Sequence, residues 1–195
     1  MMNGIGAHEV IIEGTDHNLH LADQDETQIE KILCAFRDRI LDLEKDKRFR
    51  YVLVFKNYGV TAGTSLAHPH CQLIATPIMP KFVKEELIGA REYFKDKERC
   101  VFCDIIKQEI SIGERVVLEN EGFILIAPFA SRFPFELHLF PRAHSYAYSE
   151  LNNHEIINLA KILKETLVRL KKTLNDPPYN FVLHIAPNII PRPGH

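Results

Sequence analysis

No apolar run in this sequence approaches the roughly 18 residues of a membrane-spanning helix, and no signal-peptide pattern opens the chain. The net charge of −2 gives no general attraction to nucleic acid or to an anionic membrane. Only four cysteines are present, two of them close together, which indicates metal chemistry rather than a secreted disulfide framework. We therefore expect a cytoplasmic protein without nucleic-acid or membrane partners, in which any phosphate recognition is local.

The most informative stretch that is present is His68-Pro69-His70-Cys71-Gln72, which opens an apolar segment typical of a buried strand. Because strand side chains alternate between faces, His68, His70 and Gln72 should point the same way. The preceding residues 57–65 form a small-residue loop, and such loops let backbone N–H groups approach a phosphate. This combination favours phosphoryl or nucleotidyl transfer through His70 over a pair of structural histidines.

A nucleophilic His70 needs a neutral ring with one nitrogen free and the other donating a hydrogen bond. The backbone carbonyl of His68 is a suitable acceptor. Gln72 and Ser65 are neutral donors that could hold phosphate oxygens as charge shifts during transfer. Asn57 could bind ribose or base, and its alternative role is that of a plain turn residue.

Two parts of the chain share a strand–helix–strand pattern at an offset of 127 residues, although α/β proteins can repeat such a pattern by chance. The coinciding features are residues 9–12 with 136–139, His17 with His144, and the helix caps at Asp25 and Asn152. The helices are expected to run to about Glu44 and Lys172, with strands 51–55 and 179–183 after them. The pattern predicts a duplicated protein, here a fragment cut at both ends.

The predicted domains are 1–80, a connecting segment 81–99 with a charged surface helix at 81–96, and 100–195. A hairpin is expected from residues 115–119 and 123–127, with 120–122 as its turn, and residues 187–195 should form a loop.

Cys100-x-x-Cys103 has the spacing of a zinc knuckle, and the repeat suggests His144 as a third ligand. A pair of small buried hydrophobic residues is the alternative. The fourth ligand is open between His195 and a residue beyond the end of the chain. By the same repeat, His17 and His68 are expected to form half of an equivalent metal site in the first unit.

The pattern Asn57-x-Gly59-x-x-x-Gly63-x-Ser65-x-x-His68-Pro69-His70-x-Gln72 resembles the signature of galactose-1-phosphate uridylyltransferases, a branch of the histidine-triad superfamily. The resemblance extends over nearly the whole chain, through residues 15–17, 129–135 and 174–180. It implies an α+β fold of two histidine-triad-like units with a mainly antiparallel sheet. It also implies a homodimer.

The activity implied by the resemblance is uridylyl transfer from UDP-glucose to His70 and then to galactose 1-phosphate. Asn57, Gly63, Ser65 and Gln72 match substrate-binding positions of the family. The ligands of structural Zn²⁺ would be His17 and His68 in one site and Cys100, Cys103 and His144 in the other. This sequence lacks three features of the family: a cysteine pair in the first half, the last ligand of the second metal site, and the C-terminal segment.

Two other functions fit the same residues. One is a nucleotidyltransferase or phosphorylase that acts on ADP-sugars or dinucleoside polyphosphates, in which only base selection differs. The other is a zinc-stabilised nucleotide-binding protein without catalysis.

Overall fold

The computed structural model describes residues 4–64 and 66–188. The chain divides into two compact units, residues 1–79 with 146–195 and residues 80–145. This division differs from the predicted domains, because the helix and strand that follow residue 145 group with the first part of the chain. None of the helices in the described part is both long enough and apolar enough to cross a membrane.

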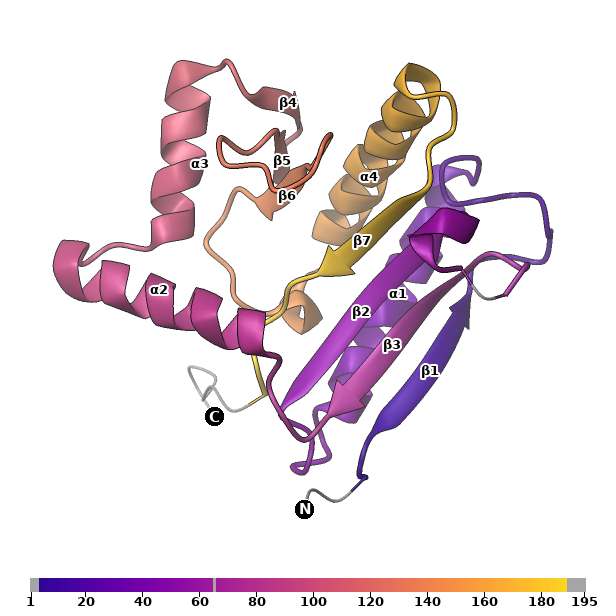
Figure 1. Cartoon of the computed structure of the whole chain (residues 1–195), viewed down its shortest axis with the longest axis horizontal. Coiled ribbons are helices and arrows are strands. Elements are labelled where there is room, and N and C mark those ends of the chain that lie inside the picture. Colours follow the sequence, from indigo (N-terminus) through magenta and orange to yellow (C-terminus); the bar gives the residue numbers. More distant parts are fainter. Residues whose placement is uncertain (1–3, 65, 189–195) are drawn as a thin grey trace. The chain divides into compact units, whose positions relative to one another are not determined.

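The first unit is built on a four-stranded antiparallel sheet (Figure 1). Its strands, in spatial order, are β1 (Ala7–Ile12), β3 (His70–Thr76), β2 (Tyr51–Tyr58) and β7 (Tyr179–Leu183). Cys71, Leu73 and Ala75 of β3 are completely buried. The alternate residues Gln72, Ile74 and Thr76 are partly exposed. One face of the sheet therefore packs into the core, and the other face is the one that His70 and Gln72 share.

Two helices cover the core face of this sheet, α1 (Glu26–Leu43) and α4 (Asn153–Thr173), and they pack on each other (Figure 1). Both begin at the predicted caps: Asp25 accepts a hydrogen bond from the Gln28 backbone N–H, and Asn152 forms a complete capping box with Glu155. The Gln28 side chain instead donates to the backbone carbonyl of Glu13, so the first cap is a simple one. Two 3₁₀ turns, η1 (Val60–Ala62) and η2 (Tyr148–Glu150), complete the unit.

The second unit contains two helices and a three-stranded antiparallel sheet. Its elements are α2 (Lys81–Lys97), α3 (Val101–Ile112), β4 (Val116–Glu119), β5 (Phe123–Ile126) and β6 (His138–Pro141). The surface helix and the hairpin agree with the sequence predictions, and the central strand β5 is buried along its length. Helix α3 was not anticipated, although Gly113 ends it in the left-handed conformation that favours glycine.

Strand β6 starts two residues later than the predicted strand 136–139. The reason lies in Glu136, whose carboxylate accepts a 2.6 Å hydrogen bond from the backbone N–H of Arg132 and so closes a loop before the strand. The α+β class with a mainly antiparallel sheet is confirmed. The duplication stays a prediction, although the two helices and the two strands that it relates, α1 with α4 and β2 with β7, lie next to each other.

Candidate functional site

His70 opens β3 on the face of the sheet opposite the core, as the alternation predicts. Its side chain is nevertheless shielded, with 4% of the residue exposed. The ring Nδ1 lies 2.8 Å from the backbone carbonyl oxygen of His68. Because a carbonyl can only accept, Nδ1 must carry the proton, and Nε2 of a neutral ring then holds the free lone pair. The carbonyl of His68 thus selects the tautomer that a nucleophilic imidazole requires.

Gln72 lies two residues further along the same face. Its Oε1 accepts a 3.0 Å hydrogen bond from Nε2 of His8 on β1, which pairs with β3. Since the carbonyl end of the amide is occupied in this way, the NH₂ group is the end of Gln72 left to donate to a ligand. This orientation suits an anionic group such as phosphate.

The loop before β3 is shaped by two glycines in left-handed conformations, Gly59 (φ 86°) and Gly63 (φ 87°), which flank η1. Thr64 Oγ1 donates a 2.7 Å hydrogen bond to the backbone carbonyl of Asn57 and closes the loop onto the end of β2. The Asn57 side chain accepts a 2.7 Å hydrogen bond from Asn180 on β7. Its own NH₂ group therefore remains the donor end. Ser65, the other predicted phosphate ligand, lies outside the described residues.

His17 and His68 come together as the repeat predicts, with their Nδ1 atoms 2.9 Å apart and their rings nearly perpendicular. Nε2 of His68 donates to the backbone carbonyl of Gly14 at 2.7 Å, so the lone pair of a neutral His68 lies on the Nδ1 that faces His17. Such a hydrogen bond on the far nitrogen is the usual way in which a metal-binding histidine is oriented. Within residues 4–64 and 66–188, no third cysteine, histidine or carboxylate joins this pair.

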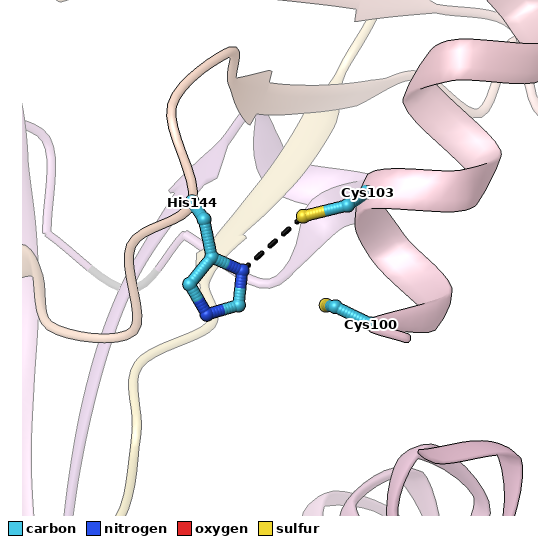
Figure 2. A group of neighbouring side chains, drawn as sticks. All are labelled: Cys100, Cys103 and His144. Carbon is cyan, nitrogen blue, oxygen red and sulfur yellow. Dashed lines mark hydrogen bonds between the residues drawn. The ribbon is translucent and has the colours of Figure 1, made fainter. Parts of the chain in front are cut away.

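The second predicted metal site is assembled wholly within the second unit (Figure 2). Cys100 caps the N-terminus of α3, Cys103 lies in its first turn, and His144 follows β6. Their ligand atoms all lie within 4.8 Å of one another, and Cys103 Sγ is 3.2 Å from His144 Nδ1. Two sulfurs and one imidazole nitrogen at this spacing fit three corners of a tetrahedral zinc site.

Burial and the neighbouring Cys100 raise the pKa of the Cys103 thiol above its ordinary value. A bound cation would have the opposite effect, because it stabilises the thiolate. The adjacent carboxylate of Asp104 is engaged elsewhere: it accepts hydrogen bonds from the Tyr93 hydroxyl at 2.8 Å and from Arg99 Nε at 2.9 Å. Both contacts hold the pKa of Asp104 below its usual range, and the hydrogen bond from Tyr93 has the larger effect. Asp104 therefore steadies the first turn of α3 beside the cysteines.

Two models of one family match consecutive parts of the sequence. The N-terminal domain of galactose-1-phosphate uridyl transferase matches residues 2–80, and the C-terminal domain matches residues 86–190. The chain belongs to the galactose-1-phosphate uridyl transferase family.

Two curated members of this family illustrate the similarity. An ADP-glucose phosphorylase of Arabidopsis thaliana is 36% identical over 184 residues, which is 94% of this chain and 51% of the relative. A galactose-1-phosphate uridylyltransferase of Thermotoga maritima is 33% identical over 183 residues, which is 93% of this chain and 57% of the relative. The chain thus spans about half the length of these relatives.

The crystal structure of an ADP-glucose phosphorylase from Arabidopsis thaliana with bound ADP-glucose superposes with a TM-score of 0.91 at 34% identity. The match covers 98% of this chain and 59% of that one. The arrangement of strands and helices described above is therefore that of the galactose-1-phosphate uridyl transferase family.

Sequence reasoning named Gln72 and Asn57 as candidate site residues, but it missed the two side chains that contact them. His8 and Asn180 lie on β1 and β7, and each contacts a candidate site residue across a strand pair. Both occupy alternating polar positions of their strands. That alternation is a signal only when the register between strands is known. His138, the first residue of β6, has a side chain that is 41% exposed.

Proposed function

We propose that this chain carries the nucleotidyl-transfer centre of a hexose-1-phosphate uridylyltransferase, with His70 as the nucleophile. The observation that carries the proposal is the hydrogen bond from His70 Nδ1 to the His68 carbonyl, which makes Nε2 the nitrogen with the lone pair in the neutral ring. The lone pair on Nε2 attacks the α-phosphorus of UDP-glucose. An N–P bond forms, the P–O bond to glucose 1-phosphate breaks, and that product leaves with the electron pair.

In the second half of the reaction, a phosphate oxygen of galactose 1-phosphate attacks the phosphorus of the uridylyl-histidine. The N–P bond breaks, UDP-galactose forms, and the electron pair returns to Nε2. The orientation of the Gln72 and Asn57 amides supports a role in binding the nucleotide, since each amide has its oxygen occupied within the protein and its NH₂ group as the donor end. Ser65 and Gly63 are proposed as further phosphate or nucleotide contacts, on the residues that match the family signature.

A second candidate reaction uses the same nucleophile with an ADP-sugar, and inorganic phosphate as the acceptor. It is favoured by the 36% identity to an ADP-glucose phosphorylase. The two candidates share the first chemical step and differ in the base and the acceptor.

The metal ions of the proposal are structural zinc. Cys100, Cys103 and His144 fit Zn²⁺ by ligand type and spacing, and His17 with His68 supply a second, two-residue set. When bound, zinc would cross-link loop segments and supply no step of the transfer. At the first set it would tie the start of α3 to the segment after β6. At the second it would fix His68, whose carbonyl orients His70.

The proposal is tested by incubating the chain with UDP-glucose or ADP-glucose, each labelled on the α-phosphate, and locating the label by peptide mass spectrometry. We expect a nucleotidyl group on His70, released again by galactose 1-phosphate or by inorganic phosphate. His70→Asn should abolish labelling, whereas His154→Asn, a change of an exposed histidine on α4, should not. Label on another residue would refute the assignment of His70, and nucleotide binding without any label would support the non-catalytic alternative.

The nucleotide that labels His70 also decides between the two candidates, because UDP-glucose and ADP-glucose can be offered in competition. Assembly as a homodimer in the cytoplasm belongs to the same proposal. Light scattering of the purified chain and imaging of a fluorescent fusion measure these two points.

A further inference from the structure

A buried ion pair lies directly behind His70, on the core face of the sheet. Lys56 on β2 is 1% exposed, and Glu13, just after β1, is completely buried. The Lys56 ammonium donates a hydrogen bond to Glu13 Oε1, and a second one, at 3.3 Å, to the backbone carbonyl of His70. The Cys71 thiol donates to the same Glu13 oxygen at 3.1 Å. The pair therefore contacts both the residue proposed as nucleophile and its neighbour.

The backbone beside this pair is tied to the same segment. The N–H of Glu13 donates to the carbonyl of Pro69 at 3.1 Å, and Gly14 accepts the hydrogen bond from His68 Nε2 at 2.7 Å. Each residue from His68 to Cys71 is thus held by residues 13, 14 or 56. The backbone carbonyl of His68, which orients the His70 ring, belongs to this segment.

Stability alone is a poor explanation for such a pair. The hydration free energy that two charges lose on burial can exceed the free energy of their attraction. A pair of apolar residues of similar volume often gives the same or greater stability. The other core-facing residues of β2, Val52 and Val54, are apolar and buried. Glu13 also has a second carboxylate oxygen, Oε2, that is buried without a hydrogen-bond partner among the described residues. The two charged side chains lie next to His70, and Lys56 donates a hydrogen bond to the His70 backbone. A pair of apolar side chains could not make this hydrogen bond.

We propose that Lys56 and Glu13 are positioning residues for His70: they hold the His68–Cys71 backbone so that His70 keeps Nδ1 protonated and Nε2 free. The inference deepens the proposed function and rests on it for its catalytic meaning. Neither side chain reaches the substrate face, so neither is a catalytic residue.

The test compares the 195-residue chain with the double variant Lys56→Met/Glu13→Gln, which removes both charges and leaves no unpaired ion. Lys164→Met is the matched control, since Lys164 also donates to a backbone carbonyl, that of Gln24, which is not one of residues 68–71. The first readout is the His70 tautomer, taken from the ¹³C and ¹⁵N chemical shifts of its ring. The second is the rate at which His70 is labelled by the nucleotide sugar.

We expect the double variant to melt cooperatively, to show a mixture of both His70 tautomers, and to label about 10- to 100-fold more slowly with little change in KM. The control should match the unchanged chain in all three measurements. A folded double variant with an unchanged His70 tautomer would overturn the inference. If the unchanged chain is not labelled while the tautomer still responds to the double substitution, the proposed function fails and the positioning role stands.

A measurement on the unchanged chain decides the matter if the double variant does not fold. The Lys56 ammonium should exchange its protons slowly with water and show a through-hydrogen-bond coupling to the ¹³C carbonyl of His70. A rapidly exchanging ammonium without that coupling would contradict the proposal.

Discussion

Asn180 Nδ2 donates to Asn57 Oδ1 at 2.7 Å, although 123 residues separate the two side chains in sequence. They are direct partners across the β2–β7 strand pair. Asn180 also donates to the backbone carbonyl of Ala62 at 2.9 Å, so one amide fixes both the candidate nucleotide-binding residue and the loop that follows it. The orientation of Asn57 therefore depends on a strand near the other end of the chain.

Replacing Asn180 tests this dependence. Asn180→Asp puts an acceptor against the oxygens of Asn57 and Ala62. We expect KM for the nucleotide sugar to rise about 10-fold, which corresponds to about 1.4 kcal/mol of binding free energy, with a smaller change in kcat. Steady-state kinetics measure both constants. Asn18→Ala, an exposed asparagine in the loop after β1, is the control and should leave them unchanged. An Asn180→Asp enzyme with an unaltered KM would contradict the proposed role.

The cysteine–histidine cluster should bind one zinc ion per chain. Cys100→Ser or Cys103→Ser should remove this metal, which is measured by elemental analysis after dialysis, because a hydroxyl is a much poorer zinc ligand than a thiolate. The Tm of the metal-loaded chain should fall when a chelator is added, and this fall should be smaller in the two variants.

Cys34→Ser is the matched control for these substitutions. Cys34 lies in α1 of the first unit and is not one of the three clustered ligands, so its change should affect neither the metal content nor the response to chelator. Full metal content in both Cys100→Ser and Cys103→Ser would show that the zinc binds elsewhere.

Glu136 should make stability depend on pH in the acidic range. Its hydrogen bond from the Arg132 backbone, followed by side-chain contacts with Arg132 and His138, lowers the pKa of Glu136 to about 2. Because the folded pKa is lower than the unfolded value of about 4.3, the stabilisation is present above that value and is lost as pH falls toward 2.

We therefore expect Glu136→Gln to lower Tm at pH 7 by about 2–4 °C, the effect of one modest interaction in a chain of this length. The difference from the unchanged protein should shrink between about pH 4 and pH 2. Differential scanning calorimetry at a series of pH values measures it. A difference that is constant over this range would mean that the carboxylate charge does not stabilise the loop.

Gly59 and Gly89 should respond in opposite directions to alanine. Gly59 has φ 86° and ψ 151°, and a Cβ there would lie 2.8 Å from Cβ of Pro178. We expect Gly59→Ala to destabilise the protein by about 2–4 kcal/mol, from backbone strain and the clash together.

Gly89 lies within helix α2, where a Cβ would meet no atom within 4 Å. Gly89→Ala should stabilise that helix by up to about 1 kcal/mol. Urea unfolding gives both values. Equal effects of the two substitutions would argue against the loop conformation described before β3.

Local chemistry made much of this protein predictable. The caps at Asp25 and Asn152, the hairpin turn at 120–122, and the shared face of His70 and Gln72 all depend on residues no more than four positions apart. Short-range geometry of this kind follows directly from the spacing of residue types along the sequence. Helix α3 was missed because the Cys100-x-x-Cys103 pattern was interpreted only as a ligand pair, although it also starts an apolar helical segment.

By itself, then, the sequence determined most of the element types, the His-Pro-His strand, the tautomer-setting carbonyl of His68 and the zinc-type cysteine pair. Only the tertiary structure decided that His8 meets Gln72, that Asn180 holds Asn57, and that Lys56 pairs with Glu13 behind His70. These contacts join residues 64, 123 and 43 positions apart. Such pairs depend on strand order and register, which arise from the packing of the whole sheet, and a shift of one residue in a strand would turn its side chains to the opposite face.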